Sequence, residues 1–523
     1  MQMILKWLTV VLLACAGSVQ AQPFSDEFPR PGVLKPNVAF WTRVFGDYSE
    51  YQSAVVHVDA PYKIYTVLDF RDELAAGKSV MQVRLMQRKE EERVKRKIDQ
   101  QLRNVHLQRN NPEALDGEER LLWSLFSDSD DPNRYKNAIG EWRAQRGLKE
   151  RTRLALETSG AYLSEMERIF DSYGLPTALT RLPLVESSFN LDAYSKVGAA
   201  GIWQFMPASA RLYMRMNEAV DDRADPWTST DAAARHLRDD YRALGNWPLA
   251  ITAYNHGRGS LARGLRETGG STLEDLLTRW DSGRRFGFAS RNFYAEFLAA
   301  TDVERNHPEF FGDVSRSEAL QFDTVSTEHY VPYGTLQRCA GVDDATFRRL
   351  NPAYRPEVIE GKLYVPPTKN IRVPKGQADG FRALYAVLGD SERFVEQRFY
   401  YSQHRVASGE TLERIARRYG VSLRNLLSAN PGVKPSRLSI GQQVRIPPRG
   451  ATDSNSRGRL VKAVDSTPVA DADGNRVHRV RSGQTLSDIA RRYRVTLSGL
   501  MELNQLGGSH LIRSGSLLKI PTG

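Results

Sequence analysis

Apolar residues recur at helical spacing through the middle of the chain, and this pattern predicts a largely α-helical region. Repeated apolar stripes run from about residue 117 to residue 305, with short breakers at Gly174-Leu175-Pro176 and Asp225-Pro226. Brief breaks of this kind are typical of helices joined by short loops. We therefore predict an all-α domain over 117–305.

The N-terminal part of the chain has a different pattern. Residues 22–50 are rich in Pro, Phe and Gly and are predicted to be irregular, whereas 54–70 contains two β-branched runs that indicate a hairpin. A highly charged stretch follows from Val80 to about Gln108, with apolar residues at helical spacing. It predicts a long amphipathic helix with a solvated charged face. The N-terminal region is accordingly 22–116, with a hairpin and a long helix.

Two C-terminal segments repeat each other. Residues 404–430 align without gaps to 478–504, with 16 of 27 positions identical, and each copy continues to a Gly-x-x-x-x-Ile-Pro ending. One copy predicts a strand, a Ser-Gly turn, two helices and a closing strand. The copies therefore span 404–447 and 478–521, and the Ser-, Asp- and Gly-rich segment 448–477 between them is predicted to be a flexible linker.

Both copies resemble the LysM module, a small βααβ unit that binds polymers containing N-acetylglucosamine. The resemblance implies a shallow glycan groove between the first strand-to-helix loop and the loop before the last strand. Peptidoglycan glycan strands are the partner it implies. The glycan-binding positions implied in the two copies are Gly409, Glu410, Thr411, Leu412 and Asn430, and Gly483, Gln484, Thr485, Leu486 and Asn504.

A third stretch, 330–367, has the same order of Leu, Leu-Asn-Pro, Gly and Val-Pro signals but lacks the Ser-Gly-x-Thr-Leu turn. We interpret 322–370 as a degenerate LysM-like unit that serves as a spacer.

Length and the first residues indicate an exported multidomain protein. A chain of 523 residues exceeds the usual size of a single core. Residues 1–21 carry one Lys, a short apolar stretch and a small-residue site before position 22, which is typical of a signal peptide. Cleavage after Ala21 and lipidation of Cys15 within "LLAC" are the two alternatives. Beyond residue 20 no apolar run is long enough to span a bilayer, so we expect no transmembrane span in the mature chain.

The positive charge of the chain is concentrated in the two repeats. Each has two acidic residues, against eight basic residues in 404–447 and seven in 478–521, so their net charges of +6 and +5 equal the +11 of the whole chain. This favours an anionic surface or polymer. No Phe or Trp is interleaved among these arginines, so a nucleic-acid partner is not expected.

The remaining composition excludes several chemistries. Besides Cys15 the only cysteine is Cys339, so the mature chain cannot form an internal disulfide, and Cys339 is expected to be buried. The nine histidines show no paired ligand spacing, and we expect neither a metal nor a cofactor.

The most informative segment is "LPLVESSFNLDAYSKVGAAGIWQFMP", 182–207, which ends an apolar run with a carboxylate, Glu186. A helix over about 177–186 would hold this carboxylate at its C-terminal end, where the macrodipole is negative. Neighbouring apolar side chains would disfavour ionisation further. Both effects predict a raised pKa for Glu186, as a general acid near neutral pH requires.

The order Glu-Ser, Gly-Ile-Trp-Gln-Phe-Met-Pro and Ala-Tyr-Asn-x-Gly resembles the lytic transglycosylase domain of the lysozyme-like superfamily. With the LysM copies, the chain resembles the membrane-bound lytic murein transglycosylase D family. The predicted fold is multidomain, with a mainly α lysozyme-like catalytic domain followed by small α+β (βααβ) LysM modules. The resemblance also implies an exported protein of the periplasm, with attachment to the outer membrane as an option.

The resemblance implies cleavage of the β-1,4 bond between N-acetylmuramic acid and N-acetylglucosamine, with formation of 1,6-anhydromuramic acid ends. Glu186 would be the catalytic acid. Ser187 would hydrogen-bond near it, and the substrate-binding residues would be Gln204, Met206, Tyr254 and Asn255. His256 has no role that the sequence reveals.

Two alternatives stay open at this point. The first is a hydrolytic muramidase on the same fold, and the second is a non-enzymatic peptidoglycan-binding protein. Hydrolysis generally uses a second carboxylate. No second acid lies within the motifs, although Asp192 and Asp222 could approach Glu186 in space.

Overall fold

The structure is a computed structural model that describes residues 27–283, 285–398, 402–447, 469–470, 476–480, 485–493, 495–506, 512 and 517–521. The chain divides into two compact units. The first comprises Met1–Thr158, Phe170–Ser188 and Ala233–Arg316, and the second comprises Ser159–Ile169, Phe189–Ala232 and Ser317–Gly523. The expected signal segment, with Cys15 and Ala21, lies outside the described residues. Within the described ranges, no helix combines the length and the apolar character that crossing a bilayer requires.

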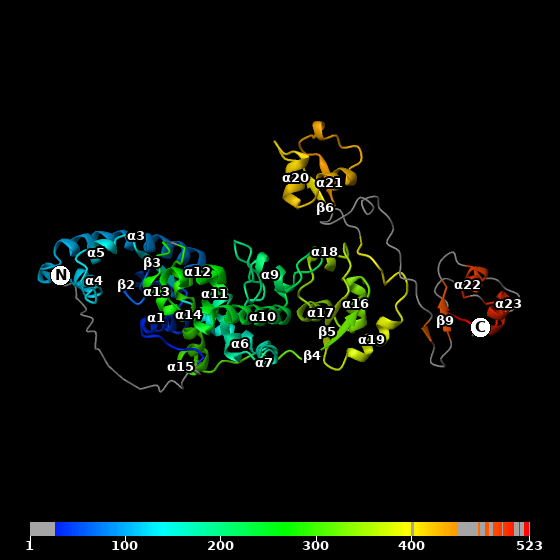
Figure 1. The fold of residues 1–523 in the computed structure, drawn as a ribbon, viewed down its shortest axis with the longest axis horizontal. Helices are drawn as coiled ribbons and strands as arrows, with labels where there is room; N and C mark the ends of the chain where they lie inside the picture. Colours follow the sequence, from blue (N-terminus) through cyan, green and yellow to red (C-terminus); the bar gives the residue numbers. More distant parts are fainter. Residues whose placement is uncertain are drawn as a thin grey trace. The chain divides into compact units, whose positions relative to one another are not determined.

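The first unit begins with a helix where the sequence predicted irregular chain. After a 3-10 turn, η1 (Gly32–Leu34), helix α1 spans Lys35–Gly46. The expectation is wrong here because Pro36 stands in the first turn, where a missing N–H costs no hydrogen bond, so it does not prevent a helix. Val38, Trp41 and Val44 are buried at helical spacing, and α1 packs along α14 (Phe288–Arg305) (Figure 1).

The predicted hairpin forms part of a three-stranded antiparallel sheet. Strands β1 (Gln52–His57) and β2 (Ile64–Asp69) pair with each other, and β3 (Trp142–Arg146) pairs with the other edge of β1. Thus 117–305 is not entirely helical. The sequence of β3, WRAQR, shows neither a β-branched run nor a clear apolar alternation, so only its pairing with β1 reveals the strand.

Helix α3 spans Val80–Leu107, where apolar spacing predicted a helix, and it begins with a Ser79–Gln82 capping box. Its apolar face shares a core with the sheet and with residues 115–138. The short helices α2 (Arg71–Ala75), η2 (Pro112–Ala114), α4 (Gly117–Ser124) and α5 (Arg134–Asn137) complete this part. Residues 117–146, which we expected to open the helical domain, therefore pack with the N-terminal region.

The remainder of the first unit is helical and is organised around α14. Helices α1, α8 and α11 all pack against it. The elements are η3 (Thr177–Arg181), α8 (Leu182–Glu186), α11 (Trp247–His256), α12 (Arg258–Thr268), α13 (Leu273–Arg279) and α15 (His307–Phe311). The chain passes from one unit to the other within α6 (Lys149–Ser159), α7 (Leu163–Ser172) and α10 (Pro226–Leu244).

The second unit contains α9 (Pro207–Tyr213), η4 (Asp222–Ala224) and a βααβ arrangement. Antiparallel strands β4 (Phe322–Thr327) and β5 (Thr368–Pro374) enclose α16 (Tyr333–Ala340), α17 (Asp344–Leu350) and α18 (Pro356–Ile359), and α19 (Ala378–Ala386) follows. Cys339 is buried in its core. The closing strand reaches Pro374, beyond the boundary of 370 expected from the Val365-Pro366 signal, because Ile371-Arg372-Val373 is the segment that pairs with β4.

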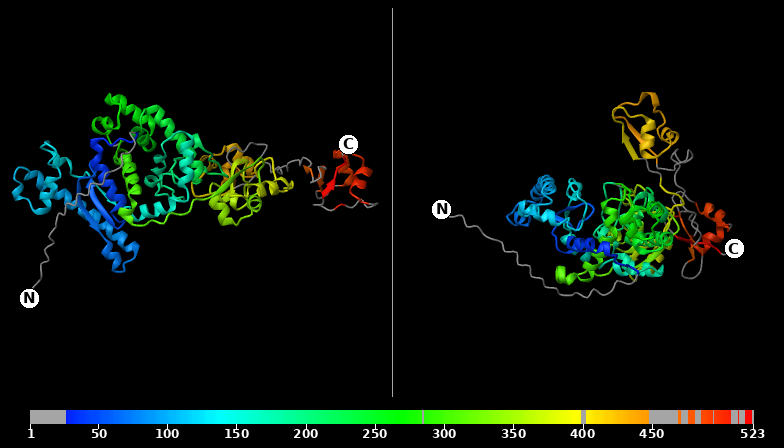
Figure 2. Two further views of the ribbon diagram at one scale, coloured as in Figure 1. Left: turned by 90° about the horizontal axis from the view of Figure 1, so that it is seen from below. Right: turned by 60° about the vertical axis from the view of Figure 1, so that its left-hand side comes forward.

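The two C-terminal repeats each fold around a small core of their own, orange and red in Figure 2. The first contains β6 (Ser402–Arg405), α20 (Leu412–Tyr419), α21 (Leu423–Ala429), η5 (Pro435–Arg437) and β7 (Gln443–Ile446). The second contains β9 (Arg476–Arg479), α22 (Leu486–Tyr493), α23 (Leu497–Leu503) and β10 (Leu517–Lys519), and β8 (Val469–Ala470) extends its sheet. Most of the expected linker 448–477 lies outside the described residues.

One ion pair is buried in the core region of the second unit. The guanidinium of Arg372 on β5 contacts the Asp225 carboxylate at the start of α10, and both side chains are only 5–6% exposed. The same guanidinium lies 4.5 Å from the centre of the Trp227 ring. Removing one member would leave the other charge buried without its partner.

We predict that Arg372→Ala lowers the free energy of unfolding by about 3 kcal/mol or more, because the Asp225 carboxylate loses its buried partner. Urea denaturation followed by tryptophan fluorescence would measure the loss. The matched control is Arg348→Ala, whose pair with Asp344 is about half exposed, with side-chain exposures of 48% and 49%. Arg348→Ala should lower the free energy of unfolding by less than about 1 kcal/mol. Equal effects of the two changes would contradict the prediction.

Candidate active site

Glu186 is the last residue of α8, a helix of only five residues that continues directly from η3. Leu182 and Leu184 anchor the helix in the core, and Pro183 stands in its first turn. The N–H of Ser187 bonds the Pro183 carbonyl at 3.1 Å, and Ser188 then takes a left-handed conformation with φ 54°. The chain turns immediately after Glu186, so the carboxyl group stays at the helix end.

The surroundings of Glu186 favour its protonated form. Burial, as the larger cause, and the charge of the nearby Glu296 carboxylate together raise the pKa of Glu186 to about 8. The direction is the one expected from the sequence, and burial, which the apolar neighbours predicted, is its larger cause, whereas the second acid was not predicted. The side chain still keeps partial exposure to solvent. A carboxyl that holds its proton at neutral pH and remains reachable is suited to general acid catalysis.

Glu296, on α14, is a site residue that sequence reasoning missed. Burial raises its pKa to about 8 as well, whereas the charge of Arg143 on β3 acts to lower it. Arg143 lies 4.3 Å from the ring centre of Phe288, at the start of α14. The available signal was a lone acid within the apolar run Phe293–Ala300. The two acids that we had considered as partners lie in the second unit, where Asp222 is buried against Arg215 and Asp192 is exposed.

Tyr254, near the end of α11, stays protonated over the whole physiological range. Burial raises its pKa well above 10, and the charges of Glu186 and Asp240 act in the same direction. Its ring lies 5.1 Å from that of His236 on α10. The Tyr254 hydroxyl therefore remains a hydrogen-bond donor close enough to Glu186 to influence it electrostatically.

Behind Tyr254 lies a buried polar group that the sequence did not indicate. Asp240 is 0% exposed, and its carboxylate oxygens lie 3.4 Å from Nε2 of His236 and 3.3 Å from Nη1 of Arg258. Burial raises the pKa of Asp240 to about 7 and lowers the pKa of His236 to about 4. Arg258 is the first residue of α12, so this group ties α10 to the turn that follows Tyr254 and Asn255.

Asn255 is held by a chain of three side chains that includes His256. Ser290 donates to Oδ1 of Asn255 at 2.9 Å, and its Oγ lies 3.0 Å from Nδ1 of His256. Because the Ser290 proton is used on Asn255, Nδ1 of His256 must be the donor to Ser290. Nε2 then accepts from Ser260 at 3.0 Å. Burial lowers the pKa of His256, in keeping with this neutral ring. His256 thus fixes Ser290, and Ser290 fixes Asn255.

The second unit carries the predicted residues Gln204 and Met206 on one loop. Gln204 has a left-handed backbone, φ 48°, and its side-chain amide donates to the Gly201 carbonyl at 2.8 Å. Met206 is 41% exposed and precedes α9. Trp203 is fully buried and donates to Thr230 at 2.8 Å, which anchors the loop. Of the predicted catalytic-domain residues, Glu186, Ser187, Tyr254 and Asn255 belong to the first unit, and Gln204 and Met206 belong to the second.

In the first LysM copy, several predicted glycan-binding side chains are used by the fold. The Glu410 carboxylate accepts from Nε2 of His404 at 2.7 Å and from the Ala407 N–H at 2.8 Å. The Asn430 side chain bonds both the N–H and the carbonyl of Arg445 on β7, at 2.8 and 2.6 Å. Leu412 is 1% exposed. Gly409 and Thr411 remain exposed on the turn before α20.

The second copy repeats this arrangement. Asn504 bonds the N–H and the carbonyl of Lys519, each at 2.6 Å, and Leu486 is 2% exposed. The Thr485 hydroxyl oxygen accepts from the Asp488 N–H at 3.2 Å and so caps α22. Gly483 and Gln484 lie outside the described residues. In the first copy, the turn with Gly409 and Thr411 is therefore open to solvent, whereas the Asn430 and Leu412 side chains are used inside the fold.

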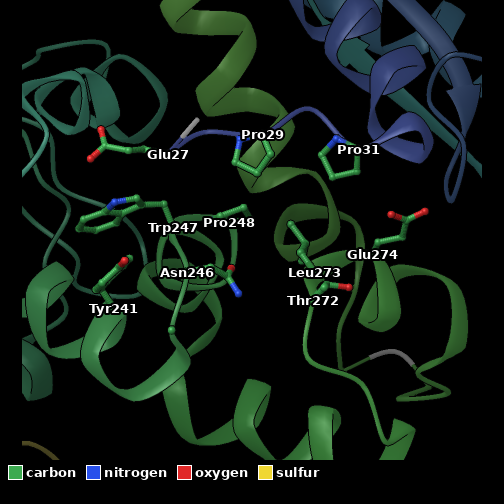
Figure 3. Close-up of a pocket in the computed structure, with 11 residues that line it drawn as sticks. Glu27, Pro29, Pro31, Tyr241, Asn246, Trp247, Pro248, Thr272, Leu273 and Glu274 are labelled. Atoms are coloured by element: carbon green, nitrogen blue, oxygen red, sulfur yellow. The ribbon is translucent and has the colours of Figure 1, made fainter. Parts of the chain in front are cut away.

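A cavity of about 370 Å³ lies elsewhere in the first unit, between the N-terminal segment and helices α10, α11 and α13 (Figure 3). On one side the rings of Tyr241 and Trp247 pack in a tilted arrangement with their centres 4.4 Å apart, and Thr272, Leu273 and Glu274 form the opposite side. None of the predicted site residues lines it. Across the described ranges, no group of three or more His, Cys, Asp or Glu side chains is placed to hold a metal ion.

We predict that Glu296→Gln lowers the pKa of Glu186, because the substitution removes the like charge that opposes its ionisation. Titration of ¹³C-labelled glutamate carboxyls by NMR, with Glu186→Gln used to identify the resonance, would measure it. Replacement of a distant surface acid, Glu274→Gln, serves as the control and should leave that resonance unchanged. An unaltered titration of Glu186 in Glu296→Gln would show that the two carboxyls do not interact.

Comparison with known proteins identifies the domains of the chain. Residues 171–276 match the family model of the transglycosylase SLT domain, and residues 404–447 and 478–521 match the LysM domain. Glu186, Gln204, Met206, Tyr254 and Asn255 all fall within the first match. Glu296 lies beyond its end.

The chain is 28% identical over 351 residues to membrane-bound lytic murein transglycosylase D of Escherichia coli K12, which covers 63% of this chain and 70% of that protein. Two solved structures are also similar. The soluble lytic transglycosylase of Escherichia coli has 19% identity and a TM-score of 0.24, with 42% of this chain and 31% of that chain covered. The lytic transglycosylase Slt of Pseudomonas aeruginosa has 19% identity and a TM-score of 0.23, with coverages of 30% and 25%. The chain thus combines a transglycosylase SLT domain with two LysM domains and is similar to a membrane-bound lytic murein transglycosylase.

Proposed function

We propose that Glu186 is the single catalytic acid–base of this peptidoglycan lytic transglycosylase. The observation that carries the proposal is a partly exposed carboxyl at the end of α8 whose pKa burial raises to about 8. At neutral pH this group holds a proton that it can deliver to a leaving oxygen. The substrate is the β-1,4 bond between N-acetylmuramic acid and N-acetylglucosamine.

One carboxyl is sufficient for both halves of this reaction. Glu186 protonates the glycosidic oxygen as the bond from that oxygen to C1 of muramic acid breaks. The resulting carboxylate then accepts the proton of the muramic C6 hydroxyl while that oxygen forms its bond to C1. The acid is regenerated, no water is consumed, and the product carries a 1,6-anhydromuramic acid end.

Glu296 makes hydrolysis a specific alternative, because a muramidase could use it as a second carboxylate. Its raised pKa argues against that use. A group with a pKa of about 8 is mainly protonated at neutral pH, and a protonated carboxyl is neither a nucleophile nor a base. Two interacting acids also release their protons in succession, so ionisation of one holds the proton on the other. Glu296 is therefore not available as a second carboxylate at neutral pH, and ring closure is left to the C6 hydroxyl.

The remaining site residues orient the sugar. Tyr254 offers a hydroxyl that stays protonated, and Asn255 is held in place by Ser290. Gln204 and Met206 contribute the glycan contacts of the second unit, on a loop that the buried Trp203 anchors. Positioning of this kind supplies a large share of the rate when the reacting oxygen belongs to the substrate itself.

The two LysM domains hold the enzyme on the wall. In the first copy the turn before α20 is exposed, with Gly409 at its centre, and both copies carry a positive net charge. Two weak contacts on one chain strengthen each other, because the second contact is intramolecular. Glycan strands of peptidoglycan are the polymer we propose for both domains.

This activity requires the enzyme to reach the cell envelope. The N-terminal segment 1–21 has the pattern of an export signal, and the name of the Escherichia coli relative describes a membrane-bound protein. We propose a periplasmic enzyme that takes part in cell wall turnover. Lipidation of Cys15 would attach it to the outer membrane, and cleavage after Ala21 would release it.

Glu186→Gln should abolish cleavage of purified peptidoglycan, a loss of at least about 10³-fold, because an amide has no proton to give the leaving oxygen. The wild-type enzyme should yield anhydromuropeptides, which mass spectrometry distinguishes from reducing muramic acid ends by the mass of one water. Sacculus binding by Glu186→Gln should equal that of the wild type and so report its integrity. Reducing ends from the wild type would establish the muramidase instead, and residual turnover by the variant would show that another group is the acid.

Deletion of residues 404–523 should lower the fraction of enzyme retained on sacculi several-fold while cleavage of short soluble glycans continues at a similar rate. Sedimentation with sacculi and turnover of a soluble glycan measure the two effects on the same preparation. Repeating the sedimentation at high salt measures the contribution of charge. The difference in retained fraction between the full and the shortened chain should then be smaller, because salt screens the charges. Equal retention of the full and shortened chains would remove the anchoring role.

A further inference from the structure

The βααβ arrangement at Phe322–Pro374 has the same internal construction as the first LysM domain. Gly341 and Gly420 both end their helices with φ 66°, and Asn351 and Asn430 follow at the same separation of 79 residues. Asn351 bonds the N–H and the carbonyl of Arg372 on β5 at 2.9 and 2.8 Å, as Asn430 bonds Arg445 on β7. This side chain thus ties the second helix to the closing strand in both units.

The edge that would meet glycan in this unit is covered by the chain itself. At the separation of 79 residues, Tyr330 occupies the place of the exposed Gly409. Tyr330 exchanges two backbone hydrogen bonds of 2.9 Å with Phe394, whose ring stacks on Tyr364 at 4.3 Å. Gln397 adds bonds to the N–H and the carbonyl of Tyr364 at 2.7 and 2.9 Å. The unit is closed on the side where the first LysM domain exposes its turn.

Another side of the unit is joined to the segment that precedes α10. Ala219 and Val220 belong to the hydrophobic core of the unit. The N–H of Asp221 bonds the Ala353 carbonyl at 2.8 Å, and the N–H of Arg355 bonds the Ala219 carbonyl at 3.0 Å. The two segments therefore fold as one body.

A chain of charged groups continues from this junction to the loop that carries Gln204. Arg355 donates to the Asp221 carboxylate at 3.1 Å and to the Asn217 carbonyl at 2.7 Å. The same carboxylate accepts from Arg223 at 2.8 and 2.9 Å. Arg223 is 3% exposed, and its Nη1 donates to the carbonyls of Gly198 and Phe205 at 2.6 and 3.1 Å. One guanidinium thus bridges the two ends of the loop 198–205.

This loop has little freedom to reach its shape by itself. Gly201 has φ 75°, and a Cβ there would lie 1.8 Å from the Arg223 carbonyl oxygen, so only glycine fits. Gln204 holds a left-handed conformation at φ 48° without being glycine, which costs energy that the surroundings must supply. The bridge from Arg223 is one such support.

We infer that the unit Phe322–Pro374 is a LysM fold that serves as a brace for the 198–205 loop, with Arg355 as the positioning residue that links them. Arg355 acts through Asp221 and Arg223 and does not contact the substrate. The inference rests on the proposed function only for the statement that Gln204 and Met206 meet the glycan. The geometry of the brace is independent of that statement.

The test compares Arg355→Ala, Arg355→Lys and Arg382→Ala in the full chain. Arg382 lies on α19 in the same part of the chain, is 60% exposed, and pairs only with Asp379 among the contacts described. Hydrogen exchange measured by mass spectrometry over 198–206 reports the loop directly, since the amides of Ala199, Ala200 and Gly201 are hydrogen-bonded within it or to the preceding turn.

Arg355→Ala should speed exchange in this peptide about ten-fold and lower kcat for soluble glycan, while retention on sacculi and the melting temperature of the LysM domains stay unchanged. Arg355→Lys, which keeps the charge on Asp221, should restore part of the protection, and Arg382→Ala should match the wild type. Unchanged exchange in Arg355→Ala would overturn the brace. The two proposals can also fail separately. If the wild-type enzyme forms no anhydro product but Arg355→Ala still exchanges faster than the wild type over 198–206, the proposed function is rejected and the brace stands.

Discussion

The candidate site depends on one constraint, which is that the carboxyl groups of Glu186 and Glu296 share a poorly hydrated space between α8 and α14. Two such groups cannot both ionise without repulsion in a medium that screens charge weakly. Burial raises the pKa of each to about 8. The site therefore holds protons at neutral pH. The short helix α8 and the buried helix α14 keep the two groups in place.

The groups around this pair follow the same rule, because burial favours their neutral forms. Tyr254 keeps its hydroxyl proton, and burial lowers the pKa values of His236 and His256. Neutral groups with fixed donors and acceptors can orient a sugar without competing for the proton of Glu186. The hydrogen bonds of His256 to Ser260 and Ser290 illustrate this, since one tautomer satisfies both and leaves Ser290 committed to Asn255.

The C-terminal half shows one architecture put to two uses. In all three βααβ units an asparagine ties the second helix to the last strand, at Asn351, Asn430 and Asn504. The first LysM domain leaves the turn before its first helix exposed. In the unit 322–374 the corresponding turn is covered by the segment around Phe394, and another side shares a core with residues that lead into α10. The same fold can bind or support, depending on which of its faces is left to solvent.

The sequence by itself determined the features that depend on local pattern. Helical spacing located α3, the repeat located both LysM domains, and motif order singled out Glu186, Tyr254 and Asn255 as candidates. It did not reveal α1 behind its proline, the strand β3, or Glu296, which lies 110 residues from Glu186 and has no motif around it. Only the tertiary structure decided that Glu410, Asn430 and Leu412 are used inside the LysM fold, and that Glu296 acts on Glu186. The physical reason is that burial and electrostatic coupling are properties of groups brought together in space, and no local pattern records which distant groups those are.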